Sequence, residues 1–188
     1  MNICVFCSSS NSVDEKFFQE ARDLGKSIGE AHNGLVYGGT NVGLMNEVAV
    51  AVKSAGGKVI GVIPKLIEEY GISADFLDEL IITPDMAERK KVLRDKSDAF
   101  VALPGGFGTL EEILEVITLK QLGYHNLPIV FINTDGFYDC LKNQFETTYQ
   151  ENFAKEDYRE FYRFENNYKD ALKYIRNYKH DQLKTKWD

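Results

Sequence analysis

Residues 34–63 of this 188-residue chain, GLVYGGTNVGLMNEVAVAVKSAGGKVIGVI, decide its fold. The stretch begins and ends with apolar runs, 34–37 and 58–63, whose unbroken hydrophobicity is typical of strands covered on two faces. Between these runs, residues 42–55 place apolar side chains on one face of a helix: Leu44, Met45, Val48 and Val52. The stretch therefore predicts a strand, a helix and a second strand parallel to the first.

The same alternation continues on both sides of this unit. We predict further strands at 3–7, 80–82, 99–103 and 129–132, and further helices at 14–31, 86–95 and 110–122. Residues 150–188 are rich in aromatic and charged side chains, and we expect them to add a last short strand and a helix packed on the sheet. The predicted fold is α/β: a Rossmann-like, open, mainly parallel sheet with helices on both faces, formed by residues 1–188 as a single domain.

The composition limits which binding partners and which cellular compartment we expect. The formal net charge of −7 disfavours nucleic acid and anionic membranes as partners, and no apolar run approaches the ~18 residues of a membrane span. Three cysteines and the lack of a signal-type leader predict reduced thiols in a cytoplasmic protein. Cys4 and Cys7 form a C-x-x-C pair, which we interpret as strand residues. The three histidines have no metal-ligand spacing, so no metal is expected.

Two glycine-rich segments follow predicted strands and precede predicted helices. They are GGTNVG at 38–43 and PGGFGTLEE at 104–112. Glycine lets a ligand approach the backbone closely, and a helix N-terminus offers unpaired N–H groups that suit a phosphate. A single loop of this kind is more often a tight turn or a helix cap, but two at one sheet edge favour an anion site. Neither matches the dinucleotide or P-loop fingerprint, which disfavours hydride transfer and P-loop hydrolysis.

Three charged residues near these loops have two interpretations each. Thr109-x-x-Glu112 matches a capping box, in which Glu112 serves only the helix end. Alternatively, the carboxylate faces a sugar next to the phosphate. Arg89 and Lys90 suit an ordinary solvated helix face, or Arg89 meets the substrate or Glu112 over the same crevice.

These residues carry a resemblance to a known family. The segments 104–112 and 38–45 (GGTNVGLM), together with MAERK at 86–90, resemble motifs of the LONELY GUY family, the cytokinin riboside 5′-monophosphate phosphoribohydrolases. Members of that family also carry the older label of possible lysine decarboxylases. The sequence does not support that label, because no lysine stands out as a pyridoxal-binding residue.

The resemblance implies a nucleotide-binding homodimer that hydrolyses the N-glycosidic bond of a purine nucleoside 5′-monophosphate, with no metal or organic cofactor. Arg89 and Glu112 would be the catalytic pair. The resemblance also implies a set of substrate-binding residues: Ser9, Gly39, Gly43, Met86, Lys90, Gly105, Gly106, Phe107, Gly108, Thr109, Leu110, Glu111 and Thr118.

Departures from the family pattern leave the base open. Ser8 and Asn46 stand where the family usually has glycine, and Ala87 replaces a usual histidine. N6-modified adenine and plain adenine, the latter as in an AMP nucleosidase, are both compatible with the sequence. The competing class is a non-catalytic nucleotide-binding or sensing module that uses the same glycine loops, and it would have no need of Arg89 and Glu112.

Overall fold

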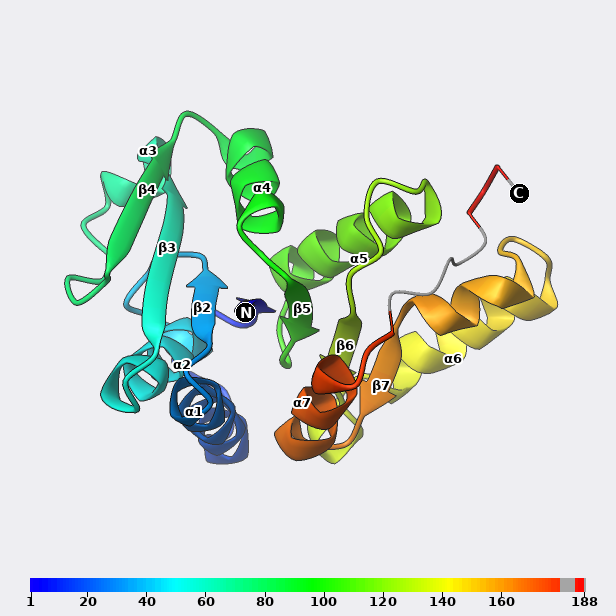
Figure 1. Ribbon diagram of the computed structural model, residues 1–188, viewed down its shortest axis with the longest axis horizontal. Coiled ribbons are helices and arrows are strands. Elements are labelled where there is room, and N and C mark those ends of the chain that lie inside the picture. Colours follow the sequence, from blue (N-terminus) through cyan, green and yellow to red (C-terminus); the bar gives the residue numbers. More distant parts are fainter. Residues whose placement is uncertain (180–184, 188) are drawn as a thin grey trace.

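The computed structural model describes residues 1–179 and 185–187, and its centre is a seven-stranded sheet in which every neighbouring pair is parallel (Figure 1). The strands are β1 (Asn2–Phe6), β2 (Gly34–Tyr37), β3 (Lys58–Pro64), β4 (Glu79–Thr83), β5 (Ala99–Ala102), β6 (Ile129–Ile132) and β7 (Arg163–Glu165). The six strands predicted between residues 3 and 132 begin and end within one residue of these bounds. The α/β, Rossmann-like prediction is confirmed.

The helices are α1 (Glu15–Glu30), α2 (Gly43–Ser54), α3 (Lys65–Glu68), α4 (Met86–Asp95), α5 (Phe107–Gln121), α6 (Asp139–Gln150) and α7 (Tyr168–Arg176), with 3-10 turns η1 (Thr134–Gly136) and η2 (Glu156–Phe161). Three points differ from the sequence prediction, and the first is that the short helix α3 was not predicted. Helix α5 begins at Phe107, three residues before the predicted start, and α6 was not predicted. Within the predicted C-terminal extension, residues 180–184 and 188 lie outside the described residues.

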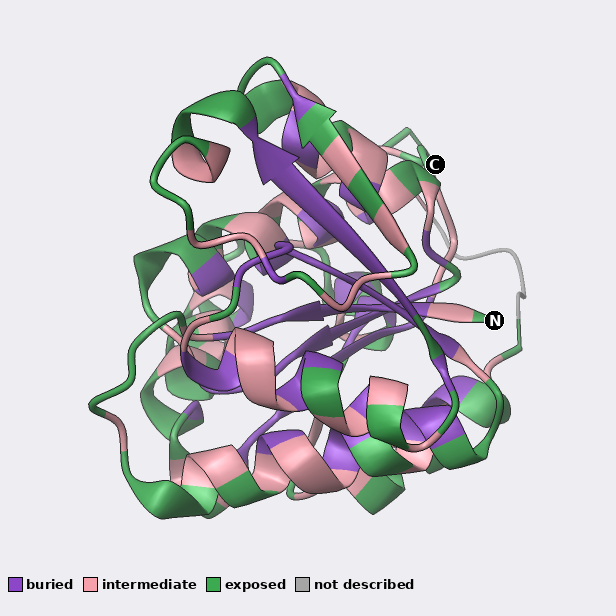
Figure 2. Cartoon of the chain, turned by 90° about the vertical axis from the view of Figure 1, so that its left-hand side faces the viewer, coloured by how far each residue is buried: buried purple, intermediate pink, exposed green. Residues whose placement is uncertain are grey.

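Helices cover both faces of the sheet. Apolar side chains of α1, α2 and α7 pack on one face, and those of α4, α5, α6 and η2 pack on the other. Successive residues of β1 alternate between the two layers, since Ile3 and Val5 join the first core cluster while Cys4 and Phe6 join the second. Figure 2 shows most of the strands buried in the interior, the edge strand β4 partly exposed, and the helices exposed along their outer sides.

Helices α1 and α2 pack unusually close together because α1 presents two glycines to α2. A Cβ placed on Gly25 would lie 2.5 Å from the Val48 carbonyl oxygen, and one on Gly29 would lie 2.6 Å from the Val52 oxygen. The α1 backbone therefore packs directly against α2, where only alanine side chains stand beside the α2 backbone at the contact. This contact fixes the loops that lead into α1 and α2 relative to each other.

The strand order β4-β3-β2-β1-β5-β6-β7 reverses direction at β1. Strands β2, β3 and β4 are added in turn on one side of β1. The chain then returns across the sheet, and β5 pairs with the other side of β1. Loops that follow β1 and β5 therefore diverge at the carboxyl edge of the sheet, where ligands of such folds bind. None of the helices in the described parts of the chain is long and apolar enough to cross a membrane.

Candidate active site

A cleft of about 540 Å³ opens between the loops that follow β1 and β5. Four short segments line it: Cys7, Ser8, Ser9 and Ser10 after β1, Met45 from α2, Met86 and Arg89 from α4, and Gly106, Phe107, Gly108, Thr109, Glu111 and Glu112 at the start of α5. Both members of the predicted catalytic pair lie in this cleft, together with seven of the thirteen predicted substrate-binding residues.

Arg89 and Glu112 form a buried ion pair in the cleft. Arg89 Nη1 donates to Glu112 Oε1 at 2.6 Å, and the two side chains are only 10% and 11% exposed. Arg89 Nε also donates to the Val62 carbonyl oxygen at 3.0 Å, which anchors the guanidinium to the end of β3. The pair joins α4 to α5 across the sheet edge. The interpretation of Arg89 as part of a solvated face is therefore wrong.

The surroundings of Glu112 act on its pKa in opposite directions. Burial raises the pKa of this carboxyl above its ordinary value, and the charge and hydrogen bond of Arg89 pull it back. Burial also raises the pKa of the neighbouring Cys7 thiol, so the floor of the cleft holds a neutral sulfur. The only strong partner of the Glu112 carboxylate among the described contacts is thus a single arginine.

The capping-box interpretation of Thr109 and Glu112 does not hold. The residue that caps α5 is Gly106, and its helix begins without a side-chain cap. Thr109 lies within the first turn, and the Glu112 side chain accepts from Arg89 instead of reaching back to the helix start. Glu112 is therefore placed for a role in the cleft.

The first turn of α5 presents open backbone N–H groups to the cleft. The N-cap residue of α5 provides no side-chain cap, as in α2, α3 and α6, whereas α1, α4 and α7 are capped by the side chains of Asp14, Asp85 and Asn167. A Cβ placed on Gly106 or Gly108 would meet no atom within 4 Å, so the space in front of this turn is open. Free N–H groups and the positive end of the helix dipole suit an anion such as phosphate.

The first glycine loop has a different task from the second. Asn41 N donates to the Ile72 oxygen at 2.8 Å, and Gly43 N donates to Asn11 Oδ1 at 2.8 Å. Gly39 and Gly43 have φ values of 77° and 58°, where glycine is favoured. Two N–H groups of this loop therefore have partners within the protein, and neither Gly39 nor Gly43 lines the cleft.

Four other predicted residues also lie outside the cleft lining. Gly105 packs against Thr109, and Leu110 packs against the core below α5. Lys90 forms ion pairs with Glu111 and with Glu115, the latter at 2.5 Å. Thr118 is far along α5, where its hydroxyl donates to the Leu114 oxygen at 2.8 Å.

Four lining residues were missed by the prediction: Cys7, Ser8, Ser10 and Met45. The serine loop gave a signal, since the strand 3–7 ends directly before it and the switch-point rule brings that loop to the cleft. Met45 ends the motif at 38–45, but its spacing on α2 predicts a core residue, so it was not expected to line the cleft.

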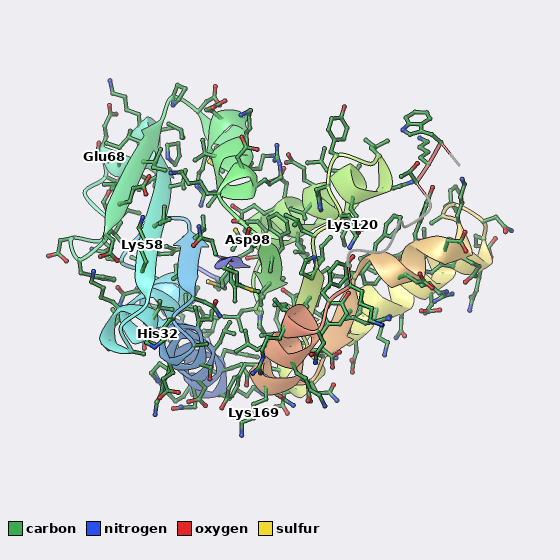
Figure 3. The ribbon with its side chains drawn as sticks, in the orientation of Figure 1. His32, Lys58, Glu68, Asp98, Lys120 and Lys169 are labelled. Atoms are coloured by element: carbon green, nitrogen blue, oxygen red, sulfur yellow. The ribbon has the colours of Figure 1, made fainter. Side chains whose placement is uncertain are left out.

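Three lysines outside α4 have structural partners. Lys53 and Lys58 pair with Asp78 and Glu79, and Lys58, labelled in Figure 3, is the first residue of β3. Lys120 is buried in a cage of two carbonyl oxygens and a phenol. In residues 1–179 and 185–187, no group of three His, Cys, Asp or Glu side chains is arranged to hold a metal ion.

Fold and cleft together define a Rossmann-like protein with a buried arginine–glutamate pair beside an open helix N-terminus. A family model described as "Possible lysine decarboxylase" matches residues 45–175. The cytokinin riboside 5′-monophosphate phosphoribohydrolase LOG5 of Arabidopsis thaliana is 40% identical over 177 residues, which cover 94% of this chain and 78% of that protein. The probable phosphoribohydrolase LOG6 of the same plant is 45% identical over 152 residues, 81% of this chain and 76% of that protein. The chain belongs to the LONELY GUY (LOG) family.

A solved structure shares the fold at low sequence identity. The molybdenum cofactor carrier protein of Chlamydomonas reinhardtii superposes with a TM-score of 0.72 at 23% identity, covering 93% of this chain and 95% of that one. Identity at this level supports the architecture alone.

Proposed function

We propose that this protein hydrolyses the N-glycosidic bond of an adenine or N6-substituted adenine nucleoside 5′-monophosphate, releasing the free base and ribose 5-phosphate. One observation carries the proposal: the buried Arg89–Glu112 pair and the uncapped start of α5 line the same cleft. The names of the relatives, which are phosphoribohydrolases of cytokinin riboside 5′-monophosphates, support the same reaction.

The spacing along α5 fits a nucleotide. In the proposed complex the 5′-phosphate accepts hydrogen bonds from the first-turn N–H groups at 107–109. Glu112 follows five residues after Phe107, about 7 Å along the helix axis. A ribose occupies the gap between phosphate and glycosidic bond, so the carboxylate reaches the sugar and not the phosphate. This arrangement accounts for a buried carboxylate so close to an anion site.

The reaction develops positive charge on the sugar. As the bond from C1′ to the base nitrogen breaks, an oxocarbenium-like state forms, and the Glu112 carboxylate stabilises it. A water oxygen then bonds to C1′ and Glu112 accepts one of the water's protons. The departing base nitrogen takes up a proton from the solvent, and Glu112 later releases its proton to the solvent, so one water is consumed in total. Arg89 favours the ionised carboxylate, which both roles require. A sensing module would have no use for a buried carboxylate at this position.

Binding of the phosphate serves the chemistry at a distance. Contacts between the α5 start and the phosphate do not change during bond cleavage, so their binding energy is available for holding the sugar against Glu112. We propose Ser9, Met86 and Phe107, which line the rim, as contacts to the sugar and base.

We also propose that the protein is a cytoplasmic homodimer. The cysteines Cys4, Cys7 and Cys140 are free, as in a reducing compartment.

Thr118 follows nine residues after Thr109, about 13 Å along α5, so it reaches a nucleotide only in a second copy's cleft. A surface groove lined by Leu114 and Thr118 supports an apolar contact there. Light scattering should give twice the chain mass for the wild type, and Leu114→Arg should shift it toward the monomer; a monomeric wild type would contradict the proposal.

The test of the reaction is base release by the purified protein. AMP and isopentenyladenosine 5′-monophosphate are incubated side by side, and free base and ribose 5-phosphate are quantified by chromatography. Glu112→Gln should bind nucleotide, but its kcat should be lower by about 100-fold or more, since the substitution removes the charge at nearly constant side-chain volume. The ratio of the two wild-type rates identifies the base class.

Glu115→Gln is the matched control. It removes a carboxylate one turn further along α5, and Glu115 pairs with Lys90 and Arg94 outside the cleft. We expect near wild-type turnover from it. Normal turnover by Glu112→Gln would reduce Glu112 to a structural residue. Tight nucleotide binding without base release by the wild type would contradict the hydrolase and favour a sensing module.

A further inference from the structure

The guanidinium of Arg89 occupies a space that exists only because residue 38 is a glycine. A Cβ placed on Gly38 would lie 2.4 Å from Arg89 Nη2 and 2.1 Å from the terminal methyl group of Met45. Both distances are far below van der Waals contact. Nη2 and the methyl group therefore meet directly over the Gly38 backbone, and any larger residue at 38 must displace one of them.

The backbone at Gly38 does not itself require glycine. Its φ is not in the positive range, in contrast to Gly39 and Gly43 in the same loop. Gly38 is also buried, directly after the last residue of β2. The absence of a side chain thus serves the neighbouring side chains, and a Gly38→Ala change alters the room for Arg89 without adding backbone strain.

Met45 closes the same space from the cleft side. Its sulfur accepts a hydrogen bond from Thr40 Oγ1 at 3.4 Å, which fixes the thioether above the loop. Three contacts then define the guanidinium: Nε on the Val62 oxygen, Nη1 on Glu112, and Nη2 between Gly38 and Met45. A planar group held at three positions can neither rotate nor slide.

We propose that Gly38 and Met45 are positioning residues for Arg89, which together keep its guanidinium on the Glu112 carboxylate. The proposal rests on the proposed hydrolase function for its kinetic consequence, but the positioning itself is independent of substrate. Displacing the guanidinium leaves a buried carboxylate without its main partner. Such a carboxyl takes up a proton at higher pH, so its titration reports whether Arg89 is in place.

The experiment follows the Glu112 carboxyl carbon by ¹³C NMR against pH in ligand-free wild type and Gly38→Ala, with Glu112→Gln identifying the signal. We expect Gly38→Ala to move the titration upward by about one pH unit or more. With substrate, the acid limb of kcat should move upward by the same amount, so the loss of kcat relative to wild type should grow as the pH falls.

Gly56→Ala is the control. Gly56 has a φ of 85° and no atom within 4 Å of an added Cβ, so alanine there strains the backbone far from Arg89. This variant should lose stability but keep the wild-type titration and pH profile. Met45→Leu, which loses the sulfur and the terminal methyl group, should move the titration in the same direction by less, and it replaces Gly38→Ala if that variant does not fold.

The outcomes separate the two proposals. An unmoved Glu112 titration in Gly38→Ala, or in Met45→Leu as its replacement, overturns the positioning role, and a loss of kcat equal at every pH does the same. A wild type that releases no base contradicts the hydrolase, but the ligand-free NMR titration still decides whether Gly38 and Met45 place Arg89.

Discussion

Replacing Lys120 by methionine should change how the stability of this protein depends on pH. Lys120 is 2% exposed, and its Nζ donates to the Leu127 and Phe161 oxygens at 2.8 and 3.0 Å and to the Tyr178 phenol at 2.8 Å. In Figure 3 it lies between α5 and the C-terminal elements. Burial lowers the pKa of this lysine from 10.5 to about 7.

The sign and size of the effect follow from linkage. Between pH 7 and 10.5 the unfolded chain binds a proton at Lys120 that the folded protein lacks, so this lysine makes stability rise with pH. At 1.36 kcal/mol per unit of pKa shift, the lowered pKa of Lys120 reduces the free energy of unfolding by about 4 kcal/mol at pH 7 and by about 2 kcal/mol at pH 9. Below pH 7 the contribution is constant.

Lys120→Met removes this dependence and keeps most of the side-chain volume. Between pH 7 and pH 9 the wild type should therefore gain about 2 kcal/mol in free energy of unfolding relative to the variant. Any pH-independent effect of the substitution shifts the difference by the same amount at every pH, and the contributions of the other titrating groups cancel. The slope isolates Lys120.

The assay is urea unfolding, followed by circular dichroism at several pH values from 6 to 9. The exposed Lys65→Met serves as the control, and its difference from wild type should stay flat. Parallel stability curves for wild type and Lys120→Met would refute the reasoning. They would show that the two carbonyls and the phenol keep the buried ammonium charged through this range.

Three further predictions test the frame of the cleft. Gly43→Ala places a Cβ 2.4 Å from the carbonyl carbon of Ser9 at a φ of 58°, so it should lower the free energy of unfolding by about 2 kcal/mol or more in urea. Glu115→Gln should lower it by about 1 kcal/mol or less, and the loss should shrink in high salt because the pairs are partly exposed. In native protein, iodoacetamide should alkylate exposed Cys140 but neither buried thiol, as mass spectrometry of the peptides will show.

The sequence predicted the sheet well because local pattern and fold agree. Each strand from β1 to β6 is a continuous apolar run bounded by glycine, proline or polar residues, so its ends are visible without tertiary information. Helix α6 was missed even though Leu141, Phe145 and Tyr149 recur every four residues and pack toward the second core cluster. Here the signal was present in a mainly polar segment and was not recognised.

The cleft was predicted in part, and the limit has a physical origin. Thr109-x-x-Glu112 fits a capping box only if α5 begins after Thr109. Its start at Phe107 instead moves Glu112 into the second turn and turns its side chain toward Arg89. Boundaries are the least certain part of a sequence prediction, and a shift of three residues decided here between a helix cap and a carboxylate that pairs with Arg89 in the cleft.

Neighbouring glycines show why the remaining features stay hidden in the sequence. Gly38 and Gly39 are identical letters in one motif, but Gly39 satisfies a φ of 77° and Gly38 leaves room for a side chain from residue 89. The first requirement is local and is typical of a glycine loop. The second exists only when β2, α2 and α4 meet, since three separate segments fill the same space. Substituting the two glycines therefore perturbs different things: Gly39→Ala strains the backbone, whereas Gly38→Ala acts through Arg89 on the protonation of Glu112.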